Sequence, residues 1–264
     1  MDSPSAITPT TADADVERRL LRLRRYNIVM GAFHAAQGVA VLLLANGFAL
    51  PVTASFLQDR PGAAAPELRT LFEIRLAWGV AAFVFLSALA HWLIASPGIY
   101  AWYRKNLLRH RNYARWIEYA LSSSVMVVLI ALLAGISDVA ALGAIFGVNA
   151  AMILFGLLME HYESPGRPRW LSFGFGCLTG AVPWALIAVY LWSPGVAAEP
   201  PAFVYGIFFS LFAFFNVFAV NMVLQYKQVG RWRDYLYGET AYVLLSLTAK
   251  SLLAWQVFAG TLAS

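Results

Sequence analysis

Two ionisable residues, Lys250 and Glu118, lie in stretches of the sequence that are otherwise apolar. Lys250 is the eleventh residue of the run 240–262, which is long enough to cross a bilayer as a helix. A lysine at that depth is costly unless it is paired, neutralised or modified. Burial also favours the uncharged amine, which is the form that attacks an aldehyde to make a Schiff base. The position therefore indicates either a Schiff-base lysine or a structural lysine that only pairs with a neighbouring helix.

A carboxylate and two hydroxyls are spaced so that they can meet this amine. Of the 14 acidic residues, Glu118 alone lies clearly inside an apolar run, so it is the natural partner of a charge on Lys250. Ser246 lies one helical turn before Lys250, and Ser122 lies one turn after Glu118, each on the same helix face as its neighbour. We therefore expect a buried cluster in which Glu118 keeps a Schiff base protonated.

The depths of the two charged residues do not match at first sight. Glu118 lies about one turn beyond Arg115, near the start of its apolar run, whereas Lys250 lies near the middle of its own. Either the helix that carries Glu118 begins earlier, around Asn106, or the pair is not direct. In the second case Arg115 points into an internal polar cavity.

Two histidines lie in the same half of the predicted bundle as Glu118. His34 is about two turns into the first apolar run, and His91 is about one turn from the end of the second. Each is either a residue that forms an interhelical hydrogen bond or a group that holds or relays a proton from the imine. The residues alone leave both interpretations open.

Seven apolar runs must position these residues, and each is long enough to cross a membrane as a helix. They are residues 26–50, 71–95, 114–136, 139–159, 170–192, 203–226 and 240–262. The chain of 264 residues is 60% hydrophobic and 12% charged, whereas soluble domains carry about 25% charged residues. We therefore predict an all-α membrane protein, a bundle of seven transmembrane helices. The connection of residues 51–70 is too long for a tight turn and is expected to hold a short β-hairpin or a lid.

Basic residues are distributed unevenly between the two ends of this bundle. Fifteen of the 19 lie in the segments on the N-terminal side, three lie on the other side, and Lys250 is the last. By the positive-inside rule, the N-terminus is cytoplasmic and the C-terminus lies outside the cell membrane. The same rule and contact with anionic lipid account for the net charge of +5, so no nucleic-acid partner is expected. Polar residues 1–25 are predicted to be a disordered cytosolic tail, and residues 26–264 the seven-helix domain.

Three stretches of the chain carry a family resemblance. The segments RWIEYALSSSVMVVLIALLAGISDVAALGAIFGVNAAMILFG (115–156), FVYGIFFSLFAFFN (203–216) and AYVLLSLTAKSLLAWQVFAGTL (241–262) resemble heliorhodopsins, and the resemblance extends over residues 27–262. It implies all-trans retinal bound covalently to Lys250, with Glu118 as the counterion and a polar cavity that holds His34 and His91. The retinal pocket that the resemblance implies comprises Ser87, Ser122, Ser246, Tyr119, Met126, Met152, Gly156, Trp184, Phe215 and Asn216.

The resemblance also implies a light receptor. Light isomerises all-trans retinal to 13-cis, the Schiff-base proton moves into the polar cavity on the cytosolic side, and the signal passes to a cytosolic signalling or enzyme partner. A homodimer is expected as well. Gly143, Gly147 and Ala151 form a stripe of small residues that suits either a dimer contact or packing inside the bundle.

Ion pumping is not expected from this arrangement of acids. A proton pump of this kind has a second acid about three turns past the counterion, and that position is Leu129. The alternative that stays open is a light-gated ion channel or transporter. The sequence contains no recognisable metal-ligand cluster, nucleotide motif or hydrolytic triad, so an enzyme is not expected.

Overall fold

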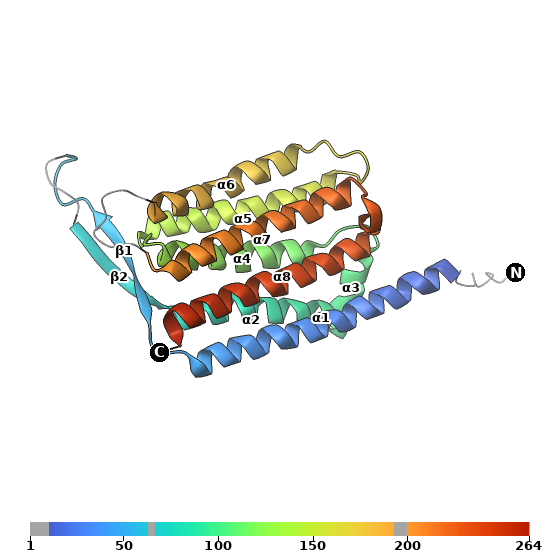
Figure 1. The fold of residues 1–264 in the computed structure, drawn as a ribbon. Helices are drawn as coiled ribbons and strands as arrows, with labels where there is room; N and C mark the ends of the chain where they lie inside the picture. Colours follow the sequence, from blue (N-terminus) through green and yellow to red (C-terminus); the bar gives the residue numbers. More distant parts are fainter. Residues whose placement is uncertain (1–10, 63–66, 193–199, 264) are drawn as a thin grey trace, which may run out of the picture.

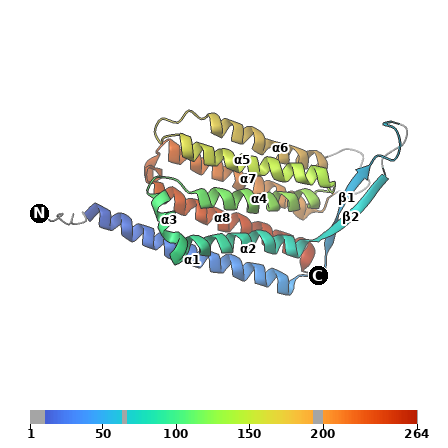
Figure 2. The ribbon, with the colours of Figure 1, turned by 180° about the vertical axis from the view of Figure 1, so that it is seen from behind.

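Seven long helices run side by side and form a bundle (Figures 1 and 2). The computed structural model describes residues 11–62, 67–192 and 200–263. Seven helices in these residues are long and apolar enough to cross a membrane, which confirms the predicted seven-helix bundle. They are α1 (Thr11–Leu44), α2 (Leu76–Ala95), α4 (Tyr113–Leu133), α5 (Val139–Tyr162), α6 (Leu171–Leu191), α7 (Ala202–Tyr226) and α8 (Tyr235–Val257). The last helix continues into a short π-helical segment, Phe258–Leu262.

The two ends of the bundle differ in what covers them. At one end a β-hairpin connects α1 to α2, and the C-terminus lies near its base (Figure 1); we call this the hairpin end. At the other end lie α3 (Pro97–Leu107) and the connections 108–112, 163–170 and 227–234, which are rich in arginine; we call this the basic end. Both α4 and α8 begin at the basic end, so these two helices are parallel.

The hairpin consists of the antiparallel strands β1 (Ala49–Phe56) and β2 (Glu67–Arg75), which confirms the hairpin expected between the first two spans. The strands include residues 49–50 and 71–75, which the apolar runs assign to the first two spans. Both helices, α1 and α2, are therefore shorter at this end than predicted. The cause is a tertiary contact. The backbone N–H of Thr53 donates to the carbonyl of Ser137 at 2.8 Å, and Val52 is buried, so the hairpin packs on the turn between α4 and α5.

The N-terminal part of α1 extends beyond the bundle at the basic end (Figure 2). Residues 11–25 are helical, so the prediction of a disordered tail over residues 1–25 is wrong for this part, and residues 1–10 lie outside the described residues. Leu20 and Leu23 are buried in a cluster with Tyr103 of α3. Arg104 of α3 also pairs with Glu17 at 2.6 Å. The extension is polar on average, but one apolar stripe packs it onto α3.

Helix α4 is the most enclosed of the seven spans. Of its most apolar 18-residue window, 56% is buried inside the protein, compared with 22% for α5. The helix begins at an N-cap, because the side chain of Asn112 accepts a hydrogen bond from the backbone N–H of Arg115 at 3.0 Å. Glu118 is the sixth residue of this helix and is therefore held inside the bundle.

Candidate functional site

Lys250 and Glu118 form a direct ion pair. Their Nζ and Oε1 atoms are 2.8 Å apart, and the two side chains are only 4% and 10% exposed. Helix α4 begins at Tyr113 rather than near Asn106, so an earlier helix start does not explain how the pair closes. The lysine side chain leans toward the N-terminus of its own helix, as long side chains on helices do, and its Nζ lies 3.0 Å from Ser246 Oγ. The direction of the side chain removes the apparent difference in depth.

Serine hydroxyls surround the carboxylate of this pair. Ser87 on α2 donates to Glu118 Oε1 at 2.6 Å, and Ser122, which is fully buried, lies one turn after Glu118 without a hydrogen-bond partner among the described residues. A buried ion pair is tolerated when hydrogen bonds satisfy its remaining polar atoms, whereas a single buried charge without a partner is strongly destabilising. The structure therefore joins Lys250 and Glu118 to Ser87 and Ser246, two of the three predicted serines, in one hydrogen-bonded cluster.

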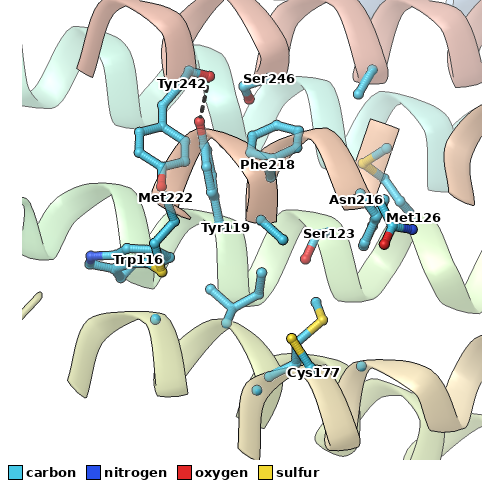
Figure 3. A pocket seen from close by; sticks show the side chains of 18 of the residues that line it. Trp116, Tyr119, Ser123, Met126, Cys177, Asn216, Phe218, Met222, Tyr242 and Ser246 are labelled. Atoms are coloured by element: carbon cyan, nitrogen blue, oxygen red, sulfur yellow. Dashed lines mark hydrogen bonds between the residues drawn. The ribbon is translucent and has the colours of Figure 1, made fainter. Parts of the chain in front are cut away.

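Tyr119 forms a wall beside the amine. Lys250 Nζ lies 5.1 Å from the centroid of the Tyr119 ring, within range of a cation–π interaction. The Tyr119 hydroxyl donates to the backbone carbonyl of Tyr242 at 2.8 Å, and Phe218 packs against the ring edge-to-face (Figure 3). The hydrogen bond and the packing fix the orientation of this ring next to the lysine.

A cavity of about 290 Å³ opens between α4, α5, α6, α7 and α8, and Lys250 is part of its wall. Most of the side chains around it are apolar or aromatic (Figure 3). Every predicted pocket residue except Ser87 lines this cavity, namely Ser122, Ser246, Tyr119, Met126, Met152, Gly156, Trp184, Phe215 and Asn216. Ser87 and Glu118 do not line it. The amine therefore has two sides, with the cavity on one and the carboxylate on the other.

Aromatic residues and a glycine shape the cavity wall. Trp184 makes edge-to-face contacts with Phe208, Phe212 and Phe215 at centroid distances of 5.3–5.6 Å. A Cβ atom at Gly156 would lie 2.4 Å from the Trp116 ring, so this glycine makes room for a side chain of the protein. The resemblance did not point to Trp116, Phe218 and Tyr242, which also line the cavity. Aromatic residues are common throughout these spans, so their types alone do not single them out.

His34 and His91 stack on each other between α1 and α2. Their ring centroids are 5.6 Å apart with an interplanar angle of 13°, and both rings interact electrostatically with Lys250. His91 Nδ1 shares a hydrogen bond of 2.6 Å with Asn27 Oδ1. His34 is fully buried, and neither of its ring nitrogens has a hydrogen-bond partner among the described residues. Buried polar groups are rarely left in this state without ordered water, so the pair marks a polar region beside the lysine.

Arg115 belongs to a different cluster. Its guanidinium pairs with Glu160 on α5 at 2.9 Å and with Glu239 on α8, and all three side chains are at most 5% exposed. The sequence offered an internal polar cavity as one place for Arg115, but the described contacts do not join Arg115 to the polar region of His34 and His91. The sequence placed Glu160 and Glu239 at helix ends. Because α5 and α8 extend further toward the basic end than their apolar runs, both acids lie inside helices.

The fold and the site define a class of protein, a seven-helix membrane protein in which a buried lysine faces an apolar cavity. The model of the Heliorhodopsin family matches residues 23–262, and the chain belongs to this family. A search of curated proteins finds no match to the chain. The family consists of light-sensing membrane rhodopsins and implies a retinal chromophore.

The residues of this cavity fit a retinal chromophore. A volume of about 290 Å³ is close to the lower end of the roughly 300–1,000 Å³ found for small-molecule sites. The wall is aromatic and apolar, as a long polyene requires, and it contains a single amine, Lys250, among its lining residues. Ser246, one turn before the lysine, also lines the cavity, so a hydroxyl group lies next to the amine in the cavity wall.

Proposed function

We propose that this chain is a light-sensing photoreceptor that carries all-trans retinal on Lys250 as a protonated Schiff base. The observation that carries the proposal is the position of Lys250 Nζ, which lies in the wall of the apolar cavity and 2.8 Å from the Glu118 carboxylate. Retinal, when bound, supplies the absorption of visible light and a change of shape from all-trans to 13-cis. The side chains around the amine control the charge and the proton at Lys250 Nζ.

Glu118 is the counterion in this proposal. Its negative charge stabilises a positive charge at Lys250 Nζ, and the hydroxyl of Ser87 holds the carboxylate in place. Ser246 contacts the same nitrogen at 3.0 Å. The interior has a low dielectric constant, so these contacts affect the proton at Nζ more strongly than they would in water.

His34 and His91 are the groups toward which the proton at Lys250 Nζ moves after light absorption. Both act electrostatically on the lysine, and His34 has two ring nitrogens without protein partners. The pair lies toward the basic end, since His91 is near the end of α2 that leads into α3. By the positive-inside rule the basic end faces the cytosol, which places the N-terminus inside and the C-terminus outside the cell membrane.

The proposed receptor does not pump ions. Leu129 occupies the position of a second helix acid and is buried in the apolar core. The other buried acids among the described residues, Glu160 and Glu239, are both paired with Arg115. The apolar cluster around Leu129 extends from α2 to the end of α8, in the half of the bundle nearer the hairpin end. Its side chains are aliphatic or aromatic and offer little to line an ion path there. This observation favours the sensor over the channel or transporter.

A homodimer is part of the same proposal. A Cβ atom at Gly143 or at Gly147 would meet nothing within 4 Å, so this stripe on α5 does not pack inside the bundle. Small residues on an open helix face allow close approach of a second helix in a membrane. We expect the signal to pass from the basic end to a cytosolic signalling or enzyme partner.

Flash photolysis combined with photocurrent recording tests the sensor against the transporter. The purified protein is reconstituted with all-trans retinal for the first measurement and expressed in voltage-clamped cells for the second. We expect a light-induced absorption cycle with no photocurrent at physiological voltage. A robust photocurrent would contradict the sensor and support the transporter instead.

A further inference from the structure

A second cavity, of about 220 Å³, lies at the basic end. It is formed by the connection between α3 and α4, the connection between α5 and α6, and the adjoining ends of α7 and α8. Its lining is mostly polar and includes Arg109, His110, Arg111, His161, Gln225 and Glu160. The function proposed above does not use this basic-end cavity.

The cations of this cavity are held in position by the surrounding chain. Arg111 donates from Nη2 to the carbonyl of His161 at 3.3 Å, and the His161 ring shares a hydrogen bond of 2.9 Å with Tyr113. His110 has a backbone φ of 55° and stacks on Tyr235 with the ring centroids 4.8 Å apart. Residues other than glycine rarely adopt a left-handed backbone conformation, so the surrounding contacts hold His110 in an uncommon conformation.

The acids of this cavity already have their own partners. Glu160 accepts hydrogen bonds or ion-pair contacts from Arg115, Trp116 and Tyr235. Glu163 accepts a hydrogen bond from the backbone N–H of Arg169 at 2.8 Å. Neither Arg109 nor Arg111 forms an ion pair with an acid among the described residues, so their positive charges are available to a ligand.

A buried amide adds an independent indication of a ligand. Gln225 lines the cavity and is only 5% exposed, and its Nε2 atom has no hydrogen-bond partner in the part of the chain that the structure describes. A buried amide donor left in this state costs free energy unless water or a ligand accepts its hydrogen bond. Arginine side chains and an amide donor together are typical of sites that bind oxyanions.

The two cavities are connected by one hydrogen bond. Glu160 lines the basic-end cavity, and its Oε2 atom accepts a hydrogen bond of 2.6 Å from Trp116 Nε1. The Trp116 ring in turn lines the cavity at Lys250. A change of charge or position at Glu160 is therefore transmitted to the wall of the chromophore cavity through a single side chain.

We infer that the basic-end cavity binds a phosphate-type oxyanion, as free phosphate or as the headgroup of an anionic lipid, and that Trp116 reports its occupancy to the chromophore cavity. Arg109, Arg111 and Gln225 hold the anion. The coupling rests on the proposed function, because it needs a chromophore at Lys250, whereas the binding does not.

Calorimetric titration with inorganic phosphate tests the binding in nanodiscs of neutral lipid. The heat is measured on the full-length protein after incubation with retinal, whether or not a visible band has formed. Arg109→Gln and Arg111→Gln should each weaken the apparent affinity about tenfold or more, since each removes a charged donor. The matched control is Arg231→Gln, because Arg231 is exposed at the same end and does not line the cavity.

Nanodiscs that contain phosphatidic acid separate the two sources of the anion. If phosphate gives no heat but phosphatidic acid raises the thermal unfolding midpoint, and both arginine variants lose this rise, the ligand is a lipid headgroup. If phosphate binds with the same arginine dependence, the ligand is free phosphate. No binding from either source, or an equal loss in Arg231→Gln, would overturn the site.

The visible band tests the coupling separately. In the unsubstituted protein the anion should shift the absorption maximum, and in Trp116→Phe the anion should bind without this shift. Phenylalanine keeps an aromatic ring in the wall but removes the N–H that reaches Glu160. An anion-dependent shift that persists in Trp116→Phe would overturn the role of Trp116, and the absence of any visible band would instead contradict the proposed function.

Discussion

Two buried ionic clusters share helices α4 and α8, and they differ in what surrounds the cation. Arg115 is enclosed by two carboxylates and lies over the Tyr242 ring at 3.9 Å, in a cluster near the basic end. Lys250 has one carboxylate partner, and its other side opens onto the apolar cavity. The two cations are close in the fold, yet only the lysine is placed where a small molecule can reach it.

This difference separates an ionic cluster that holds helices together from one that supports chemistry. The Arg115 cluster joins α4, α5 and α8 and has an indole and a phenol as further donors to Glu160. The Lys250 cluster is completed by neutral serine hydroxyls. We therefore expect substitutions in the first cluster to affect mainly stability, and substitutions in the second to affect mainly colour.

The largest expected effect is on the stability of Arg115→Gln. The substitution leaves Glu160 and Glu239 buried without their cation, which should lower the free energy of unfolding by about 3–5 kcal/mol. Denaturant unfolding in detergent measures the change, and Arg167→Gln is the control because Arg167 is exposed at the same end. A loss no larger than that of the control would show that the cluster does not hold the helices together.

Glu118→Gln should change the colour of the pigment more than any other single substitution in the Lys250 cluster. Without the negative charge, the positive charge spreads from Lys250 Nζ along the polyene, so the band should move to longer wavelength. The imine should also lose its proton at a lower pH, because a nearby carboxylate no longer stabilises the protonated form. Spectra over a pH series measure both effects, with Glu73→Gln on the exposed face of β2 as the control. An unchanged spectrum would place the counterion elsewhere.

Ser87→Ala should give the smallest of the three effects. It removes one hydrogen bond of 2.6 Å to the Glu118 carboxylate, and a hydrogen bond to a charged group contributes about 1.5 kcal/mol. We expect a loss of stability of that size and a shift of the band in the same direction as for Glu118→Gln, but smaller. Thr240→Ala is the matched control, since that exposed hydroxyl donates only to the helix carbonyl of Leu236. Equal effects of the two substitutions on stability and on the absorption band would show that Ser87 does not support the counterion.

The sequence predicts the bundle well because membrane spans depend on composition over about 20 residues. It fails where a contact with another element decides the outcome. The hairpin takes residues from both flanking spans because Thr53 pairs with the turn at Ser137, and the polar start of α1 is helical because Leu20 and Leu23 pack on α3. These contacts cannot be read from the local composition of either segment.

The site at Lys250 shows the same difference between what the sequence predicts and what tertiary contacts decide. Lys250 and Glu118 stand out in the sequence because charges are rare in apolar runs, and the structure places them 2.8 Å apart. The apparent difference in depth arises from counting Cα positions, whereas the lysine side chain extends toward the start of its helix. Glu160 and Glu239 were not predicted to be buried because they lie at the polar borders of their spans, where acids are common.

Reconstitution with all-trans retinal tests the central claim most directly. The unsubstituted protein should form a visible absorption band, and so should Lys227→Ala, which removes an exposed lysine at the basic end. Lys250→Ala should form none, and neither should the double variant Lys250→Ala/Glu118→Gln, which leaves no unpaired buried carboxylate and so controls for misfolding. A band that survives in either Lys250 variant, or a folded unsubstituted protein that forms no band, would contradict the account.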